Sequence, residues 1–192
     1  MILTAHQPNF FPWLPFFSKI HSADVCVILE NVQYVKHNFQ NRFWFDSGWK
    51  TLSVKSSHLQ TKICEKEYAT PTSDWTRIKA SIGYTWLSSF DHCFNQSLSM
   101  TNFEIITQIT NMMNIKSAIV KDRPLIDCDA TETLLTYCLE HGATTYLSGP
   151  SGKKYLNIDR FSDFGIKVQF QNIDSQAHSR LPILEYLNHA QY

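Results

Sequence analysis

The first 34 residues constrain the fold more than any other part of the chain. They begin with a short apolar run that predicts a strand ending at His6 and Gln7, because the proline that follows has no backbone N–H for a sheet. A densely apolar segment with helical spacing runs from 11 to 20, with Pro12 in its first turn. Residues 25–29 then predict a second buried strand. The carboxyl ends of such parallel strands form the edge of a sheet where ligands bind.

The carboxyl third of the chain returns to the same alternation. Strands are expected at 117–125, 144–147 and 166–171, with helices beginning at Asp129 and Lys153. Alternating strands and helices are typical of a parallel sheet wound by right-handed crossovers. We therefore expect an α/β fold: an open, mostly parallel sheet with helices on both faces.

The middle of the chain, 35–115, is expected to be a hairpin and helical insertion within a single domain of residues 1–192. Two alternating segments flank the turn Asp46-Ser47-Gly48 and predict an aromatic β-hairpin, which either covers a pocket or is an ordinary flap. A weak strand is expected near 62–67. Helices are expected at 75–84 and 103–113, where the apolar residues fall on one face, and a further helix is expected at 90–97.

Composition sets the limits on the class of protein. With 192 residues, 43% of them hydrophobic, the chain can bury one substantial core. Lys plus Arg and Asp plus Glu are 17 each, so net charge indicates neither a nucleic acid nor a membrane surface as partner. The sequence shows no signal peptide and no apolar run long enough to span a membrane, which predicts a cytoplasmic protein. The expected partner is a small-molecule substrate. Five cysteines without C-x-x-C spacing argue against a disulfide framework and a zinc site.

Two groups of polar residues are candidates for chemistry. His6 lies at a strand end, where it is a general base or a partner of a buried carbonyl, and Arg42 is either a clamp for phosphate or carboxylate or a solvated hairpin residue. The turn from Ser148 to Lys154 suits an anion, although its glycine spacing is weaker than that of a Walker A loop and a tight turn favours the same residues. We expect His6 and Arg42 to be catalytic. The expected substrate-binding residues are Gln7, Asn31, Gln33, Tyr34, Asn41, Ser148, Gly149, Ser151, Lys153 and Lys154.

Five separated blocks of sequence stand in the chain in this order: His6–Leu14, Ser22–Val25, Asn31–Tyr34, Gln40–Arg42 and Gly142–Pro150. Together they resemble the WbqC-like protein family. The resemblance spans nearly the whole chain and implies a bacterial protein of O-antigen or other surface-polysaccharide biosynthesis. Glu30-Asn31 stands where relatives often have two aspartates, so we expect no tightly bound metal. The sequence assigns no cofactor and no oligomeric state.

A second resemblance, to the nucleotidyltransferase-like Rossmannoid superfamily, is at the level of the fold. The early strand ending in histidine and the late Ser-Gly turn carry it, but the H-x-G-H pair of that superfamily is missing. Three functions stay open. The first is a transferase acting on a nucleotide-activated sugar or an amino sugar, with acyl or aminoacyl transfer favoured. The others are a nucleotidyl-transfer or ATP-dependent activating enzyme, and a non-catalytic carbohydrate- or nucleotide-binding protein. All of them require the His6–Gln7 pair and the Ser148–Gly149 corner to open onto one cavity.

Overall fold

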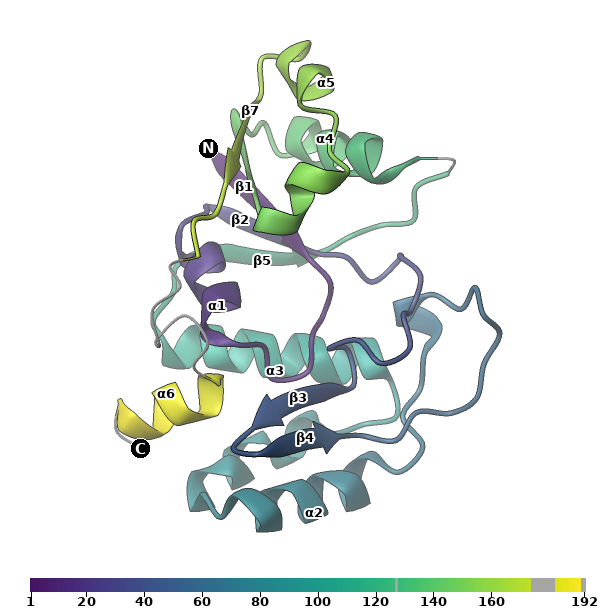
Figure 1. Ribbon diagram of the computed structural model, residues 1–192, viewed down its shortest axis with the longest axis vertical. Coiled ribbons are helices and arrows are strands. Elements are labelled where there is room, and N and C mark those ends of the chain that lie inside the picture. Colours follow the sequence, from purple (N-terminus) through teal and green to yellow (C-terminus); the bar gives the residue numbers. More distant parts are fainter. Residues whose placement is uncertain (127, 174–181, 191–192) are drawn as a thin grey trace.

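A five-stranded parallel sheet forms the centre of the computed structural model, which describes residues 1–126, 128–173 and 182–190 (Figure 1). Its strands are β1 (Ile2–His6), β2 (Val25–Ile28), β5 (Ala118–Lys121), β6 (Thr145–Ser148) and β7 (Lys167–Phe170). They lie in the order β5-β2-β1-β6-β7, and every neighbouring pair is parallel. The predicted open parallel sheet and its strands are confirmed.

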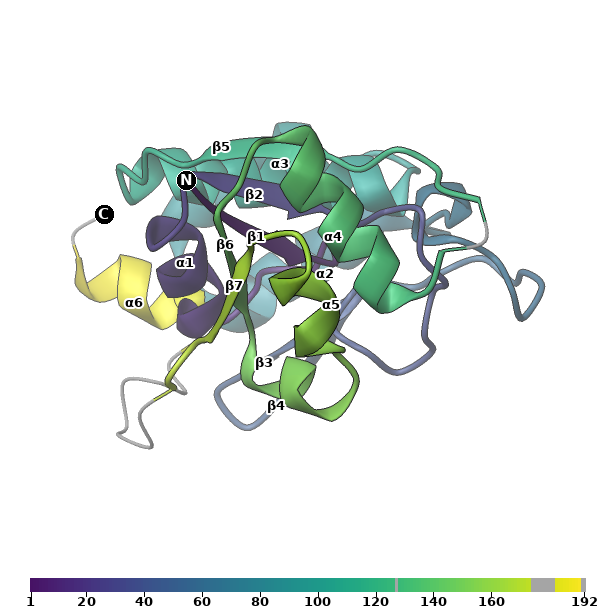
Figure 2. The same cartoon turned by 90° about the horizontal axis from the view of Figure 1, so that it is seen from above.

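The pairing register decides which side chains face which layer of helices. Leu3 lies opposite Val25 on the same face of the sheet, and both pack with α4 (Ala130–Glu140) and α5 (Ile158–Ser162). The residues that follow Leu3 and Val25 by one position point to the opposite face of the sheet. There Cys26 belongs to the apolar cluster of α1 (Leu14–His21) and α3 (Leu98–Met112), and His6 pairs with Ile28. Figure 2 shows α1 and α4 on opposite sides of β1 and β6.

A second layer, inserted between β2 and β5, lies beside the sheet. It contains the hairpin β3 (Arg42–Phe45) and β4 (Gly48–Thr51), then η1 (Ile63–Glu65), α2 (Pro71–Ile82), η2 (Thr85–Cys93) and α3. Figure 1 shows α3 between the sheet and the hairpin, with α2 beyond the hairpin. One apolar cluster runs from α1 through α3 to the hairpin and α2. The predicted hairpin around Asp46-Ser47-Gly48 is confirmed.

Several predicted helix boundaries are wrong. Helix α1 begins at Leu14 instead of residue 11, because Phe11 has a φ of 42°, which no right-handed helix accommodates. Helix α3 begins five residues earlier than expected, where the Ser97 side chain accepts a hydrogen bond from the Met100 N–H. Helix α2 begins at Pro71, a favoured first-turn residue.

Other predicted elements have a different type. Of the helix expected at 90–97, only residues 90–93 are helical, as the end of the 3₁₀ segment η2. The strand expected near 62–67 is the short turn η1 with isolated bridges beside it. The helix expected from Lys153 is η3 (Pro150–Lys154), another 3₁₀ segment. Helix α6 (Ile183–His189) was not predicted, and it packs on the same apolar cluster as α1. No helix in the described ranges is long and apolar enough to cross a membrane.

Asn102 on α3 holds the two layers together. Its buried amide donates to the carbonyl oxygens of Pro8 at 2.8 Å and Gln40 at 2.7 Å, and its oxygen accepts from the Tyr68 hydroxyl at 3.0 Å. Pro8 follows the central strand, and Gln40 precedes the hairpin. The amide therefore fixes the position of the hairpin relative to the end of β1.

We predict that Asn102→Ala destabilises the fold by about 3 kcal/mol, because buried polar groups of three other residues lose a partner. Urea unfolding measures the difference. Asn111→Ala is the matched control on the same helix, since Asn111 is exposed, and it should change stability by about 0.5 kcal/mol or less. Equal effects of the two variants would contradict the role of Asn102.

Candidate functional site

The strand order reverses between β1 and β6, and ligands of open α/β sheets bind at such a point. Numbered along the chain, the five sheet strands have the order 3-2-1-4-5. A cavity of about 300 Å³ lies there, at the carboxyl ends of β1 and β6. We call it the switch-point cavity. Its lining residues are Ala5, His6, Gln7, Asn9, Lys19, Leu29, Asn38, Phe39, Leu134, Tyr146, Ser148, Gly149, Ser151 and Tyr155.

The two corners that the sequence singled out do share this cavity. His6 and Gln7 line it from the end of β1, and Ser148 and Gly149 line it from the end of β6. Parallel pairing of β1 with β6 brings these segments together although about 140 residues separate them in sequence. The expectation of a common cavity is therefore confirmed.

His6 is held on the α1 side of the sheet. Its ring centroid lies 4.4 Å from that of Phe16, and its backbone carbonyl accepts a hydrogen bond from Leu29 at 2.8 Å. Burial lowers the pKa of His6 well below its usual value, and the charge of Lys19 lowers that pKa further, while a hydrogen bond with the backbone of Gln7 opposes the shift. At neutral pH the imidazole is therefore uncharged and available as a proton acceptor.

Lys19 is a site residue that the sequence analysis missed. Its side chain comes from α1 and lines the switch-point cavity, and only 3% of the residue is exposed. The ammonium donates to the carbonyl oxygen of Ala5 at 3.1 Å. Burial lowers the pKa of Lys19 to about 8, an effect that the Cys26 thiol partly opposes. Its position three residues after Phe16 and one before Ile20, on the apolar side of α1, was the available signal.

Lys19 is the one charged group of the cavity lining at neutral pH, among the residues that the structure describes. No aspartate or glutamate lines the cavity in these ranges. Burial raises the pKa values of Tyr146 and Tyr155, so both hydroxyls stay neutral. His6 is neutral as well. The cavity therefore carries a single positive charge.

Asn9 is a second site residue that was not predicted individually. It is 8% exposed and lines the switch-point cavity as well as two neighbouring hollows. Its carboxamide makes no hydrogen bond with any residue in the described parts of the chain. Its amide atoms are not among the fully buried, unpartnered polar atoms of the described residues, so they are open to the cavity, where Asn9 offers hydrogen bonds to a bound molecule.

The β6 corner requires glycine at one position. The Ser148 hydroxyl donates to the Gly149 carbonyl oxygen at 3.0 Å. A Cβ atom at Gly152 would lie 2.0 Å from Ser148 Oγ, so a larger residue would displace the serine. Gly152 therefore allows η3 to close against the end of β6, and this brings Ser151 to the cavity.

Other predicted anion-binding residues lie outside this cavity. Lys153 and Lys154 are exposed, and the Lys153 ammonium lies 5.4 Å from the centre of the Phe170 ring. The Arg42 guanidinium stacks on the Trp49 ring at 4.1 Å and donates to the His37 carbonyl oxygen. None of the three lines the switch-point cavity, so their expected roles there stay predictions without a geometric basis.

The predicted residues after β2 separate into different surroundings. The Asn31 amide donates to the Asp122 carboxylate at 2.8 Å, and Asn41 is buried with its amide donating to the Leu52 carbonyl oxygen at 2.8 Å. Gln33 and Tyr34 line another hollow of about 500 Å³ with Lys66. The structure therefore does not bring these four residues to His6.

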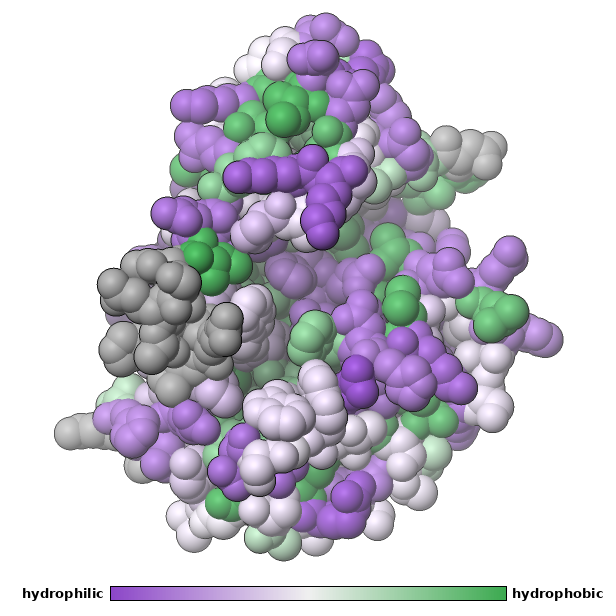
Figure 3. All heavy atoms as spheres, in the orientation of Figure 1, coloured by the Kyte–Doolittle hydropathy of each residue, from purple (hydrophilic) through white to green (hydrophobic). Residues whose placement is uncertain are grey.

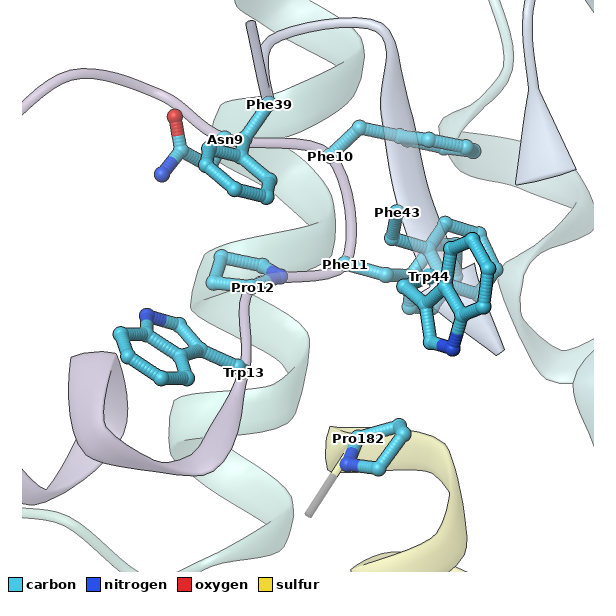
Figure 4. Close-up of a pocket in the computed structure, with 9 residues that line it drawn as sticks. All are labelled: Asn9, Phe10, Phe11, Pro12, Trp13, Phe39, Phe43, Trp44 and Pro182. Carbon is cyan, nitrogen blue, oxygen red and sulfur yellow. The ribbon is translucent and has the colours of Figure 1, made fainter. Parts of the chain in front are cut away.

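An apolar pocket adjoins the switch-point cavity. It has a volume of about 160 Å³ and shares Asn9 and Phe39 with that cavity. We call it the aromatic pocket; its lining residues are Asn9, Phe10, Phe11, Pro12, Trp13, Phe39, Phe43, Trp44 and Pro182. In Figure 4 the Asn9 carboxamide points away from the rings of Phe43 and Trp44. Figure 3 shows this face hollowed between the part with β7 and α5 and the part with the hairpin.

Fold and cavity together define an α/β protein with a cavity at the switch point of a parallel sheet, lined by one lysine. The chain belongs to the WbqC-like protein family, whose model matches residues 7–182. It is also similar to a Mycobacterium tuberculosis protein named "Uncharacterized protein Rv1507c", with 25% identity over 189 residues that cover 88% of this chain and 80% of the relative. No solved structure matches the chain.

We predict that Lys19 gives the fold a distinctive pH dependence. Its folded-state pKa of about 8 lies below the unfolded value of about 10.5, so the charged form favours unfolding. The loss of unfolding free energy caused by the buried charge is complete below pH 8 and disappears as the pH rises through 10.5. Relative to Lys19→Met, the wild type should therefore gain on the order of 3 kcal/mol of stability between these limits.

Denaturant unfolding at several pH values measures this difference. Lys116→Met is the control, because Lys116 is exposed and outside the cavity. Its stability difference from the wild type should not change across the same range. A difference between wild type and Lys19→Met that is constant with pH would contradict the burial of the ammonium.

Proposed function

We propose that the protein is a transferase that acts on a nucleotide-activated sugar or an amino sugar in the assembly of bacterial surface polysaccharide, with acyl or aminoacyl transfer favoured. The observation that carries this proposal is the common cavity of His6 and the Ser148–Gly149 corner, with a buried cation beside them. Family membership supports the biological setting. The residues that line the cavity support acyl or aminoacyl transfer as the reaction.

His6 is proposed as the general base. Its ring is uncharged at neutral pH, as proton abstraction requires, and it lies at the strand end where the cavity begins. In acyl transfer the acceptor oxygen or nitrogen forms a bond to the acyl carbon, and the bond from that carbon to the leaving group breaks. His6 takes the acceptor proton and passes it to the leaving group.

The neighbouring pocket supports a sugar as part of the substrate. Sugars have apolar C–H faces and polar hydroxyls, and pockets for such molecules combine aromatic walls with a few placed polar groups. Here the walls include Trp13 and Trp44, and Asn9 lies at the border with the switch-point cavity. Gln7 lines the switch-point cavity and is fixed there, because its oxygen accepts a hydrogen bond from Gln40 at 2.6 Å.

One observation favours a second candidate, nucleotidyl transfer or ATP-dependent activation. The strand order 3-2-1-4-5 is the order of nucleotide-binding sheets of the Rossmann type, as expected for the nucleotidyltransferase-like fold. Against it stands the single histidine at the end of β1. A fold of this kind supports many activities, so the reaction has to be measured.

We predict that nucleotide-sugars, alone or with acyl donors, raise the melting temperature of the protein. A ligand at 100 times its dissociation constant stabilises by about 2.7 kcal/mol. Turnover is then followed by mass spectrometry of the sugar product. Release of pyrophosphate from ATP would contradict the transferase function and support an ATP-dependent activating enzyme. Binding without turnover would support a non-catalytic binding protein.

We predict that His6→Ala lowers turnover at least tenfold, which corresponds to about 1.4 kcal/mol of transition-state stabilisation. Because the pKa of His6 is lowered, wild-type activity should stay constant at neutral pH and fall only well below pH 6.5, where the imidazole becomes protonated. A steady-state pH profile tests both points. Wild-type rates in His6→Ala would remove the histidine from the mechanism.

A further inference from the structure

Lys19 has a charge without a counter-ion. Its ammonium carries three N–H donors, and in the described parts of the chain one acceptor, the Ala5 carbonyl oxygen, is within hydrogen-bond distance. No ion pair of the described residues includes Lys19. A buried charge is unfavourable unless it is paired, so this ammonium has a strong preference for an anion in the cavity.

Further hydrogen-bonding groups surround the same space. The Asn9 carboxamide comes from the segment after β1, in a residue that is 8% exposed, and the Ser151 hydroxyl comes from η3. Gly149 lies next to the ammonium, because a Cβ atom built at this glycine would be 4.0 Å from Lys19 Nζ. No side chain of residue 149 therefore separates β6 from the ammonium. The groups thus reach the cavity from three separate segments.

This arrangement suits a phosphate better than a carboxylate. A carboxylate is planar and is bound most specifically by the two parallel N–H groups of an arginine, whereas lysine acts on phosphate as a point charge. No arginine lines the cavity in the described ranges. A phosphoryl group has several oxygens pointing in different directions, which donors from several elements can reach together.

We propose that Lys19 and Asn9 form a phosphate-binding subsite in the switch-point cavity, so that the substrate carries a phosphoryl group within reach of His6. The inference rests on the proposed transferase function and narrows it, because it selects a phosphorylated sugar substrate, such as a nucleotide-activated sugar, over a free amino sugar. The aromatic pocket, which shares Asn9 and Phe39 with that cavity, then receives the uncharged part of the same substrate.

Isothermal titration of the full chain with inorganic pyrophosphate at pH 7 tests the subsite. The wild type is expected to bind pyrophosphate at one site. Lys19→Met should weaken the binding at least tenfold, and Asn9→Leu should weaken it as well. Lys116→Met, which removes an exposed lysine, should bind like the wild type. Circular dichroism and the melting temperature of each variant establish that it is folded.

Two results would overturn the subsite. The first is undiminished pyrophosphate binding in folded Lys19→Met. The second is loss of binding in Lys153→Met/Lys154→Met with retention in Lys19→Met, which would assign the anion to the exposed turn. Acetate at the same concentration should not compete with pyrophosphate, and displacement by acetate would favour a carboxylate ligand and overturn the preference for phosphate.

The same titration separates this inference from the proposed function. Suppose that pyrophosphate binding depends on Lys19 and that the protein turns over no sugar substrate. This result would support the subsite and contradict the proposed transferase function. Sugar transfer by a protein whose pyrophosphate binding is indifferent to Lys19 would support the transferase and overturn the subsite.

Discussion

Parallel pairing of the first strand with β2 on one side and β6 on the other is the constraint on which the rest of the structure depends. Because the order of strands reverses at β1, the helix after β1 and the segment after β6 leave on different sides of the sheet. Side chains from both ends therefore border one space. His6 lines this cavity from the α1 side of the sheet, and Ser148 lines it from the end of β6. The cavity is thus a consequence of the topology, and the residues around it decide its chemistry.

The chemistry of this space is unusual for an apolar environment. Helix α1 presents phenylalanine and isoleucine to the core, yet Lys19 lies among them with its ammonium in the cavity. The burial that lowers the pKa of Lys19 to about 8 also costs folding free energy. The same positive charge helps to keep His6 neutral. Proteins accept such local costs at functional sites, where the unpaired group is satisfied by a ligand. A neutral base and an unpaired cation in one cavity are suited to a substrate that has both an ionisable acceptor and an anion.

Strands were predictable from the sequence because buried parallel strands are short apolar runs. Once the strands were located, the residues at their carboxyl ends, His6 and Ser148, were predictable as well. Helix boundaries were less accurate, since they depend on caps such as Ser97 and on the positive φ of Phe11. Lys19 was missed because a lysine on an amphipathic helix usually marks the solvent side. Gln33 and Tyr34 follow β2 in sequence, but the chain turns after Asn31, which Asp122 holds from 91 residues away. Long-range hydrogen bonds of this kind leave no local pattern in the sequence.

The central claim is that the switch-point cavity is the ligand site of this protein. Amide chemical shifts of the labelled protein, titrated with a nucleoside diphosphate, test it most directly, because they locate binding without assuming a reaction. The largest shifts are expected at the amides of His6, Gln7 and Asn9, at Lys19 and at the non-proline residues of 148–151. Shifts concentrated instead at 33–36 and 55–66, around the hollow of Gln33 and Tyr34, would contradict it.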